Sequence, residues 1–333
     1  MSSRITRSNR LAWASAVALA AVLAACGGGG GDGDDSGPPG TIDLTVANRD
    51  TVAHATAAGA MGLGGADRVV SVGGSVATQR HVAQALRTTR ERPLGVVGPI
   101  NEPCLVSGST ITSLDDRDND GVPSPGDALT IQFVQCKDSV EETVSGTMSL
   151  TITQLRDTAL GGSLRQDAFS VVREDAGQQH ALTLTGTMQL SYTESSPDAA
   201  TLRLVADGAV RANVSTPIFT DVVTLADGYV QESVIDLSVP PPPGSFTPGR
   251  VSTTSSGRMN SQAAGGDVTV ATTTPIAQYS DDEFPRAGVL LVTGRTGTLR
   301  ISALSTVEVQ LGLDTDGNGT TDVTTLERWD WLI

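Results

Sequence analysis

The stretch VSGTMSLTI, which runs from Val144 to Ile152, decides the fold class of this chain. From Met148 onward its apolar side chains alternate with serine and threonine. In an extended chain this alternation places the two sets of side chains on opposite faces. The stretch therefore predicts a strand with one dry face and one wet face.

A local repeat carries this prediction to other parts of the chain. GTMSL at residues 146–150 returns as GTMQL at residues 186–190, which begin 40 residues later. Weaker copies begin at Gly208, Gly257 and Gly297, and the last two are again 40 residues apart. A recurring interval of this kind is consistent with duplicated β-hairpin units.

The sequence from Leu105 onward keeps the same texture, with Gly, Asp, Asn or Pro interrupting the alternation. We therefore expect a mainly β fold: an antiparallel meander of hairpins, arranged as a sandwich or as an open or half barrel. The final strand, 321–332, is expected to carry Trp329 and Trp331 on one face. Other late strands are expected at 288–292, 298–304 and 306–313.

Residues 41–103 precede this β region and predict one or two short helices packed on the sheet. Asn48 or Asp50 is suited to cap a first helix. Apolar residues recur at helical spacing between Val69 and Leu86, and Pro93 ends that pattern.

The expected β domain spans residues 104–333, and a run of prolines interrupts it. Pro240–Pro243, followed by Gly244, cannot lie in a central strand because proline lacks the backbone donor. The interruption is either a long loop within one sheet or a boundary between two halves.

The most specific binding motif is an acidic loop between two expected strands. Counting Asp116 as position one, Asp118 and Asp120 stand at positions three and five, and Asp127 at position twelve. With the Val122 carbonyl at position seven, these are the oxygen ligands of an EF-hand-like calcium loop. The flanking sequence reads as strands, so we expect the loop on a hairpin. The alternative is a solvated turn whose side chains bond their own backbone.

A second acidic loop near the C-terminus has a weaker match to the same pattern. It offers Asp314, Asp316, Asn318, Thr320 and Asp322 at positions one, three, five, seven and nine. Threonine occupies its twelfth position, so the acid expected there is missing. A calcium ion and a solvated turn are again the two interpretations.

The N-terminal residues have the order of an export signal. Three arginines precede an apolar run from Leu11 to Ala25, which is too short to span a bilayer. The run ends in Leu23-Ala24-Ala25-Cys26, which resembles the lipobox of bacterial lipoproteins. That resemblance implies removal of residues 1–25 and acyl chains, palmitate among them, on Cys26. An ordinary cleaved signal peptide followed by an unmodified thiol is the alternative.

Residues 26–40 are rich in Gly, Asp and Pro and predict a flexible tether. In lipoproteins of two-membraned bacteria, an aspartate after the acylated cysteine favours the inner membrane. Gly27 stands at this position, so the resemblance implies the outer membrane and leaves the leaflet open.

Cys104 and Cys136 are the only other cysteines. In an exported chain, two remaining cysteines predict one disulfide, because the compartment is oxidising. A pair of free thiols that is reactive or binds metal is the alternative.

Composition excludes several classes of function. A formal net charge of -15 argues against binding to nucleic acid or to anionic lipid head groups. The three histidines, His54, His81 and His180, belong to no recognisable zinc-hydrolase motif, and the chain carries no nucleophile elbow or phosphate loop. We therefore expect no catalytic residues.

Together these features predict a lipid-anchored protein of the cell envelope. We expect a non-catalytic structural or interaction module that binds an envelope partner and uses calcium, if any cofactor, as a stabiliser. A carrier of lipid or another apolar ligand on a curved sheet is the first alternative. A hydrolase of unrecognised type is the second.

Overall fold

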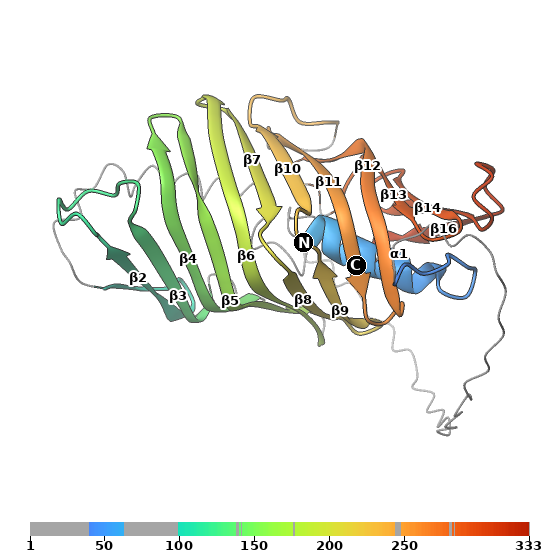
Figure 1. Cartoon of the computed structure of the whole chain (residues 1–333), viewed down its shortest axis with the longest axis horizontal. Helices are drawn as coiled ribbons and strands as arrows, with labels where there is room; N and C mark the ends of the chain where they lie inside the picture. Colours follow the sequence, from blue (N-terminus) through green and yellow to red (C-terminus); the bar gives the residue numbers. More distant parts are fainter. Residues whose placement is uncertain are drawn as a thin grey trace, which may run out of the picture. The chain divides into compact units, whose positions relative to one another are not determined.

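Sixteen antiparallel strands form one sheet in the computed structural model of this protein (Figure 1). The structure describes residues 40–62, 99–137, 140, 142–175, 177–243, 248–279, 282 and 284–332. The prediction of a mainly β, antiparallel meander with a short N-terminal helix is confirmed. The elements are α1 (Arg49–Gly62), β1 (Ile100–Pro103), β2 (Ser107–Asp115), β3 (Ala128–Lys137), β4 (Glu142–Arg156), β5 (Ala159–Asp175), β6 (Gln178–Ser196), β7 (Ala199–Ala206), β8 (Val210–Ser215), β9 (Thr220–Leu225), β10 (Val230–Asp236), β11 (Arg250–Ser261), β12 (Gly266–Tyr279), β13 (Ala287–Thr293), β14 (Thr298–Ala303), β15 (Glu308–Asp314), β16 (Val323–Arg328) and α4 (Trp329–Leu332).

The strands follow chain order across the sheet except at a fork between β6 and β11. The long strand β6 pairs with β7 along Met188–Ser196 and with β8 along Ala181–Thr185. In the same way, β11 pairs with β10 along Arg250–Ser256 and with β9 along Met259–Ser261. Two paired strands therefore fill each half of the gap between β6 and β11: β7 with β10 in one half, and the β8–β9 hairpin in the other.

The repeated glycines mark places where a strand bends past a neighbouring backbone. Gly146 has a φ of 98° and Gly186 a φ of 148°, both in the left-handed half of φ space. A Cβ at Gly146 would overlap the carbonyl of Ala168, and one at Gly186 would overlap the backbone of Val210. Only glycine meets both demands, which explains why the two strong copies of the repeat begin with it.

One face of the sheet, here called the inner face, carries the main core and helix α1. Alternate residues of the strands reach this face, as expected from the period-two pattern; Leu290 and Ile301, for example, pair across β13 and β14 and are 1% exposed. Helix α1 packs on β9, β11 and β14. Its contacting residues are mostly alanine, so the helix axis can approach the strands closely.

A second apolar cluster covers the inner face of β4, β5, β6, β7, β10 and β11. The register joins its members across the strands: Leu160 lies opposite Tyr192, and Ile235 opposite both Ala200 and Val251. These side chains are all at least nine-tenths buried.

Residues 42–44, which precede α1, are hydrogen-bonded to the C-terminal half of the sheet. The Ile42 and Leu44 N–H groups donate to the carbonyls of Asp267 and Thr296. The Asp43 carboxylate accepts hydrogen bonds from the Arg295 guanidinium and the Thr296 hydroxyl. This pairing, at 2.5 Å to Arg295 Nη2, holds the pKa of Asp43 to about 2.

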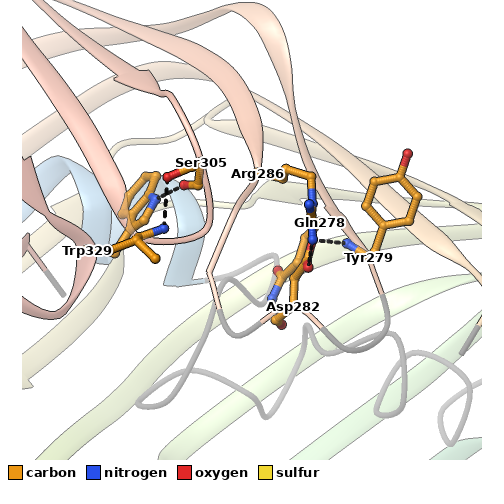
Figure 2. A network of polar contacts seen from close by, with 7 residues as sticks. Gln278, Tyr279, Asp282, Arg286, Ser305 and Trp329 are labelled. Carbon is orange, nitrogen blue, oxygen red and sulfur yellow. Dashed lines mark hydrogen bonds and ion pairs between the residues drawn. The ribbon is translucent and has the colours of Figure 1, made fainter. Parts of the chain in front are cut away.

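The chain ends differently from the prediction. The last strand stops at Arg328, and Trp329 and Trp331 lie on the short helix α4, so the expected strand 321–332 is too long. Trp329 is 1% exposed and its indole N–H donates to the Ser305 carbonyl at 2.9 Å (Figure 2). This buried hydrogen bond directs the chain into the core, whereas a continuation of β16 would extend the chain past the edge of the sheet.

A polar cluster closes the turn between β12 and β13. Asp282 accepts two bonds from the Arg286 guanidinium and one from the Tyr279 N–H, and its own carbonyl accepts from Gln278 Nε2 (Figure 2).

Two of the sequence predictions concern regions around the described elements. The helix expected between Val69 and Leu86 lies outside the described residues, as do the signal, Cys26 and most of the tether. The strands that flank Pro240–Pro243, β10 and β11, pair directly with each other in one sheet.

Two acidic loops as the candidate metal centre

The first acidic loop joins β2 to β3, and its side chains bond its own backbone in a regular order. Asp116, at position one, accepts from the Gly121 N–H at 2.7 Å. Asp118 accepts from the Asp120 N–H, and Asp120 from the Val122 N–H. The side chains at positions one, three and five therefore accept from the N–H groups at positions six, five and seven, respectively.

The second loop joins β15 to β16 and repeats the same order. Asp314 accepts from the Gly319 N–H at 2.8 Å, Asp316 from the Asn318 N–H, and Asn318 from the Thr320 N–H. Counted from Asp314, these bonds again run from one to six, from three to five and from five to seven.

The backbones of the two loops share their unusual conformations as well. Position four is left-handed in both, with φ of 56° at Asn119 and 72° at Gly317. Position six is also left-handed, with φ of 76° at Gly121 and 86° at Gly319. Glycine and asparagine tolerate this region best, so the residue types at both positions follow from the turn.

The loops differ in the acid that closes them. In the first, Asp127 at position twelve accepts from the N–H groups of Arg117 and Ser124, at 3.0 and 2.7 Å. In the second, Asp322 at position nine accepts from the Thr315 N–H at 2.8 Å. Arg117 and Thr315 both occupy position two, so Asp322 takes over one of the bonds that Asp127 makes in the longer loop.

Each loop gathers three carboxylates whose oxygens lie within 4.8 Å of one another. Asp116, Asp118 and Asp120 form the first cluster, and Asp314, Asp316 and Asp322 form the second. Groups of oxygen donors such as these can hold a hard divalent cation. The part of the chain that the structure describes thus has two places at which a metal ion could bind.

The hydrogen bonds and the crowding of charge shift the acids of the first loop in opposite directions. The Gly121 N–H is the main cause that holds the pKa of Asp116 below its ordinary value. The adjoining Asp116 carboxyl is the main cause that raises the pKa of Asp118, because the two groups share a hydrogen bond best when one is protonated. The Asp116 Oδ1 atom is buried and has no protein partner. A bound cation would relieve both features.

The structure gives the predicted ligands unequal positions. Asp127 is 1% exposed, both of its oxygens accept backbone bonds, and it is not part of the cluster that Asp116, Asp118 and Asp120 form. Asn318 donates through its side-chain amide to Asp316 at 2.9 Å. The predicted ligands did not include Ser124 at position nine, whose hydroxyl donates to Asp118 at 3.2 Å.

A disulfide between Cys104 and Cys136 encloses β2, the first loop and most of β3. Their Cα atoms are 5.5 Å apart, and Cys136 is 4% exposed. The first loop therefore stands on a covalently closed hairpin.

The two described histidines take positions in the fold itself. His54 is 8% exposed and stacks on Phe219 and Trp331, and its Nδ1 lies 2.8 Å from the Leu332 carbonyl. Burial is the main cause that lowers the pKa of His54. His180 lies opposite Arg173 in the β5–β6 ladder. His81 lies outside the described residues.

Comparison of the chain with protein-family models, with curated proteins and with solved structures finds no match. Neither described helix is both long and apolar enough to cross a membrane.

Proposed function

We propose that this protein is a lipid-anchored envelope protein whose β sheet is a non-catalytic structural or interaction module stabilised by calcium at its two acidic loops. The anchor is the lipid on Cys26, and the outer membrane is its site. The partner is another component of the envelope.

The observation that carries the calcium part is the repetition of one loop at opposite ends of the sheet order. The two loops share three side-chain bonds and two left-handed positions, and each of them gathers three carboxylates whose oxygens lie within 4.8 Å of one another. All the clustered side chains offer oxygen, which calcium prefers to nitrogen or sulfur. An exported protein lies outside the reducing, calcium-poor cytoplasm, so calcium is available to it.

The packing supports a module over a carrier. The inner face of β9, β11 and β14 is occupied by α1, and the residues at that contact are fully buried. A carrier on this face would need the space that α1 takes. Extraction of the purified protein with organic solvent tests this point, because a stoichiometric lipid other than the anchor would favour the carrier.

Calcium binding is tested by thermal unfolding of the full chain in calcium and in chelator. A site that binds one ion, with calcium at about 100 times its Kd, should add about 2.7 kcal/mol to the free energy of unfolding. Asp118→Ala and Asp316→Ala should each reduce the calcium-dependent shift. Asp198→Ala, an acid in the β6–β7 turn, is the matched control and should leave it unchanged. Identical melting curves in calcium and chelator would contradict the proposal.

The anchor is tested by the mass of the intact mature protein. We expect a chain that begins at Cys26 and is heavier than the polypeptide by the acyl groups. Cys26→Ser should abolish the added mass and release the protein from membranes. A wild-type protein that weighs no more than its polypeptide would remove the anchor and leave the calcium proposal standing.

A further inference from the structure

Asn318 and Gly319 form the one Asn-Gly pair of the chain, and they stand at positions five and six of the second acidic loop. Glycine has no side chain, so its backbone nitrogen can approach the amide carbon of the preceding asparagine without obstruction. The turn itself demands the glycine, since Gly319 has a φ of 86°. Both residues are exposed, so water reaches them.

The Asn318 side chain is folded back over the peptide group that joins it to Gly319. Its Oδ1 accepts from the Thr320 N–H at 2.7 Å, and its Nδ2 donates to Asp316 Oδ2 at 2.9 Å. The bond from Thr320 closes a ring that contains both the amide carbon Cγ and the Gly319 nitrogen. The loop therefore holds an electrophilic carbon and a backbone nitrogen in one small ring.

The Gly319 nitrogen also contacts a base. Its N–H donates to Asp314 Oδ2 at 2.8 Å, and Asp314 is 5% exposed. A carboxylate that already accepts this hydrogen bond is placed to take the proton, as a general base does. One oxygen of Asp314 and one of Asp316 lie within 4.8 Å of each other. The proton thus has a short path to Asp316, which contacts the amide nitrogen of Asn318.

We propose that the second loop converts its own Asn318 to aspartate. The Gly319 nitrogen attacks Cγ of Asn318 and gives its proton to Asp314. The Thr320 N–H stabilises the negative charge that develops on Oδ1. The bond from Cγ to Nδ2 then breaks, and the proton returns through Asp316 to the departing nitrogen, which leaves as ammonia.

Water completes the conversion by opening the succinimide ring that this attack forms. It adds to Cγ of residue 318 and breaks the new bond to the Gly319 nitrogen, which regains a proton. The backbone is restored, and the side chain now ends in a carboxyl group. The sum of the two steps is one water consumed and one ammonia released, with no oxidation or reduction. The reaction occurs once per chain and needs neither an external substrate nor a metal ion.

The first loop shows that the product fits this fold. Its position five is Asp120, which accepts from the N–H at position seven as Asn318 does in the second loop. Its position-six N–H bonds the acid at position one, again as in the second loop. The conversion therefore gives the second loop the position-five acid that is encoded only in the first.

The first test follows the mass of residue 318 in the purified full chain, incubated in chelator. After reduction of the disulfide, trypsin releases fragment 301–328, in which Asn318 is the one asparagine, and fragment 118–137, in which Asn119 is. We expect fragment 301–328 to gain, with time, the mass difference between an amide and a carboxyl group. Asn119 is followed by aspartate and should keep its amide. A fragment 301–328 that also keeps its amide would overturn the proposal.

The second test separates the effect of the loop from the reactivity of the Asn-Gly pair. Urea unfolding keeps the pair and removes the loop. We expect conversion to be about 100-fold slower in the unfolded chain, because a positioned general base contributes a factor of this order. Equal rates, or a faster reaction in the unfolded chain, would overturn the proposal.

Asp314→Asn tests the assigned base and should slow the conversion by about 100-fold. Asp330→Asn makes the same change at an acid that pairs with Arg328 outside the loop, and it should leave the rate unchanged. Circular dichroism shows whether both variants are folded. A folded Asp314→Asn chain that converts at the wild-type rate would overturn the role of Asp314.

The product identifies the carbonyl of the ring that water attacks. The Thr320 N–H polarises the bond from Cγ to Oδ1, so attack at Cγ should give aspartate in an ordinary backbone. Attack at the main-chain carbonyl would give isoaspartate and lengthen the backbone. Electron-transfer fragmentation of fragment 301–328 distinguishes the two products, and isoaspartate as the main product would overturn the conversion to aspartate.

Discussion

The β2–β3 and β15–β16 hairpins carry nearly the same loop on very different supports. In the second hairpin, Val309, Leu311 and Leu313 of β15 are fully buried, and the chain continues into α4. In the first, Cys136 is the one fully buried residue of β2 and β3, and it belongs to the disulfide. A turn encoded by local bonds can thus be held either by a core or by a covalent bridge.

The largest effect should come from removing the core support of the second hairpin. Trp329→Ala deletes a buried indole and its bond to Ser305, and we expect a loss of about 3–5 kcal/mol in the free energy of unfolding. Urea unfolding measures it. Trp331→Ala is the matched control, since Trp331 is only partly buried and should cost less. Equal losses would show that the C-terminal turn does not anchor the hairpin.

Removing the disulfide should destabilise the first hairpin by about the free energy that the length of the closed loop predicts. For a sequence separation of 32, the chain-entropy model gives about 3–4 kcal/mol. We expect Cys104→Ala with Cys136→Ala to speed amide exchange in β2 and β3 and to leave β15 and β16 unchanged. Faster exchange in both hairpins would break the comparison.

The closing acids should differ in importance although they make a similar bond. Asp127→Asn keeps one acceptor oxygen where two buried ones were used, so we expect a loss of about 1–3 kcal/mol in chelator. Asp322→Asn should cost less, because its carboxyl is exposed to solvent. Thermal melting of the two variants side by side checks the order, and the reverse order would contradict the assigned roles.

The smallest expected effect is a pH dependence of stability that comes from the ion pair between Asp43 and Arg295 at the C-terminal half of the sheet. The pKa of Asp43 is lowered from 3.8 to about 2, so its contribution to stability is present above about pH 3.8 and is lost as the pH falls toward 2. Asp43 and Arg295 are 38% and 39% exposed, so solvent screening keeps the contribution below about 1 kcal/mol. Subtracting the profile of Asp43→Asn from that of wild type should reveal it. A difference that grows above pH 5 would have the wrong sign.

The strands were predictable because their signal is local. Alternation in residues 144–152 predicts β4, and the late strands are found within a few residues of their predicted bounds. The start of α1 was also predictable, since Asn48 directly precedes it, although its side chain accepts from Thr45 instead of capping the helix interior.

The parts that sequence could not supply depend on contacts between distant residues. Nothing near Trp329 signals that the chain will leave the sheet there, because the cause is Ser305 and the packing against α1. Likewise, the oxygens of Asp127 could not be assigned from spacing alone, since spacing does not show that backbone N–H groups use them. The role of Asp322 follows from its bond to the Thr315 N–H, because Thr315 occupies the place that Arg117 has in the first loop, and spacing alone does not show this bond.

The fork at β6 and β11 has a consequence for how the molecule unfolds. Each of these strands is hydrogen-bonded to three others, so neither can detach by the loss of one ladder. Among the strands that the structure describes, the N-terminal and C-terminal ones join through this doubly bridged middle. Fraying should therefore begin at β1 and β16 and stop at the fork, which would melt last and in a single cooperative step.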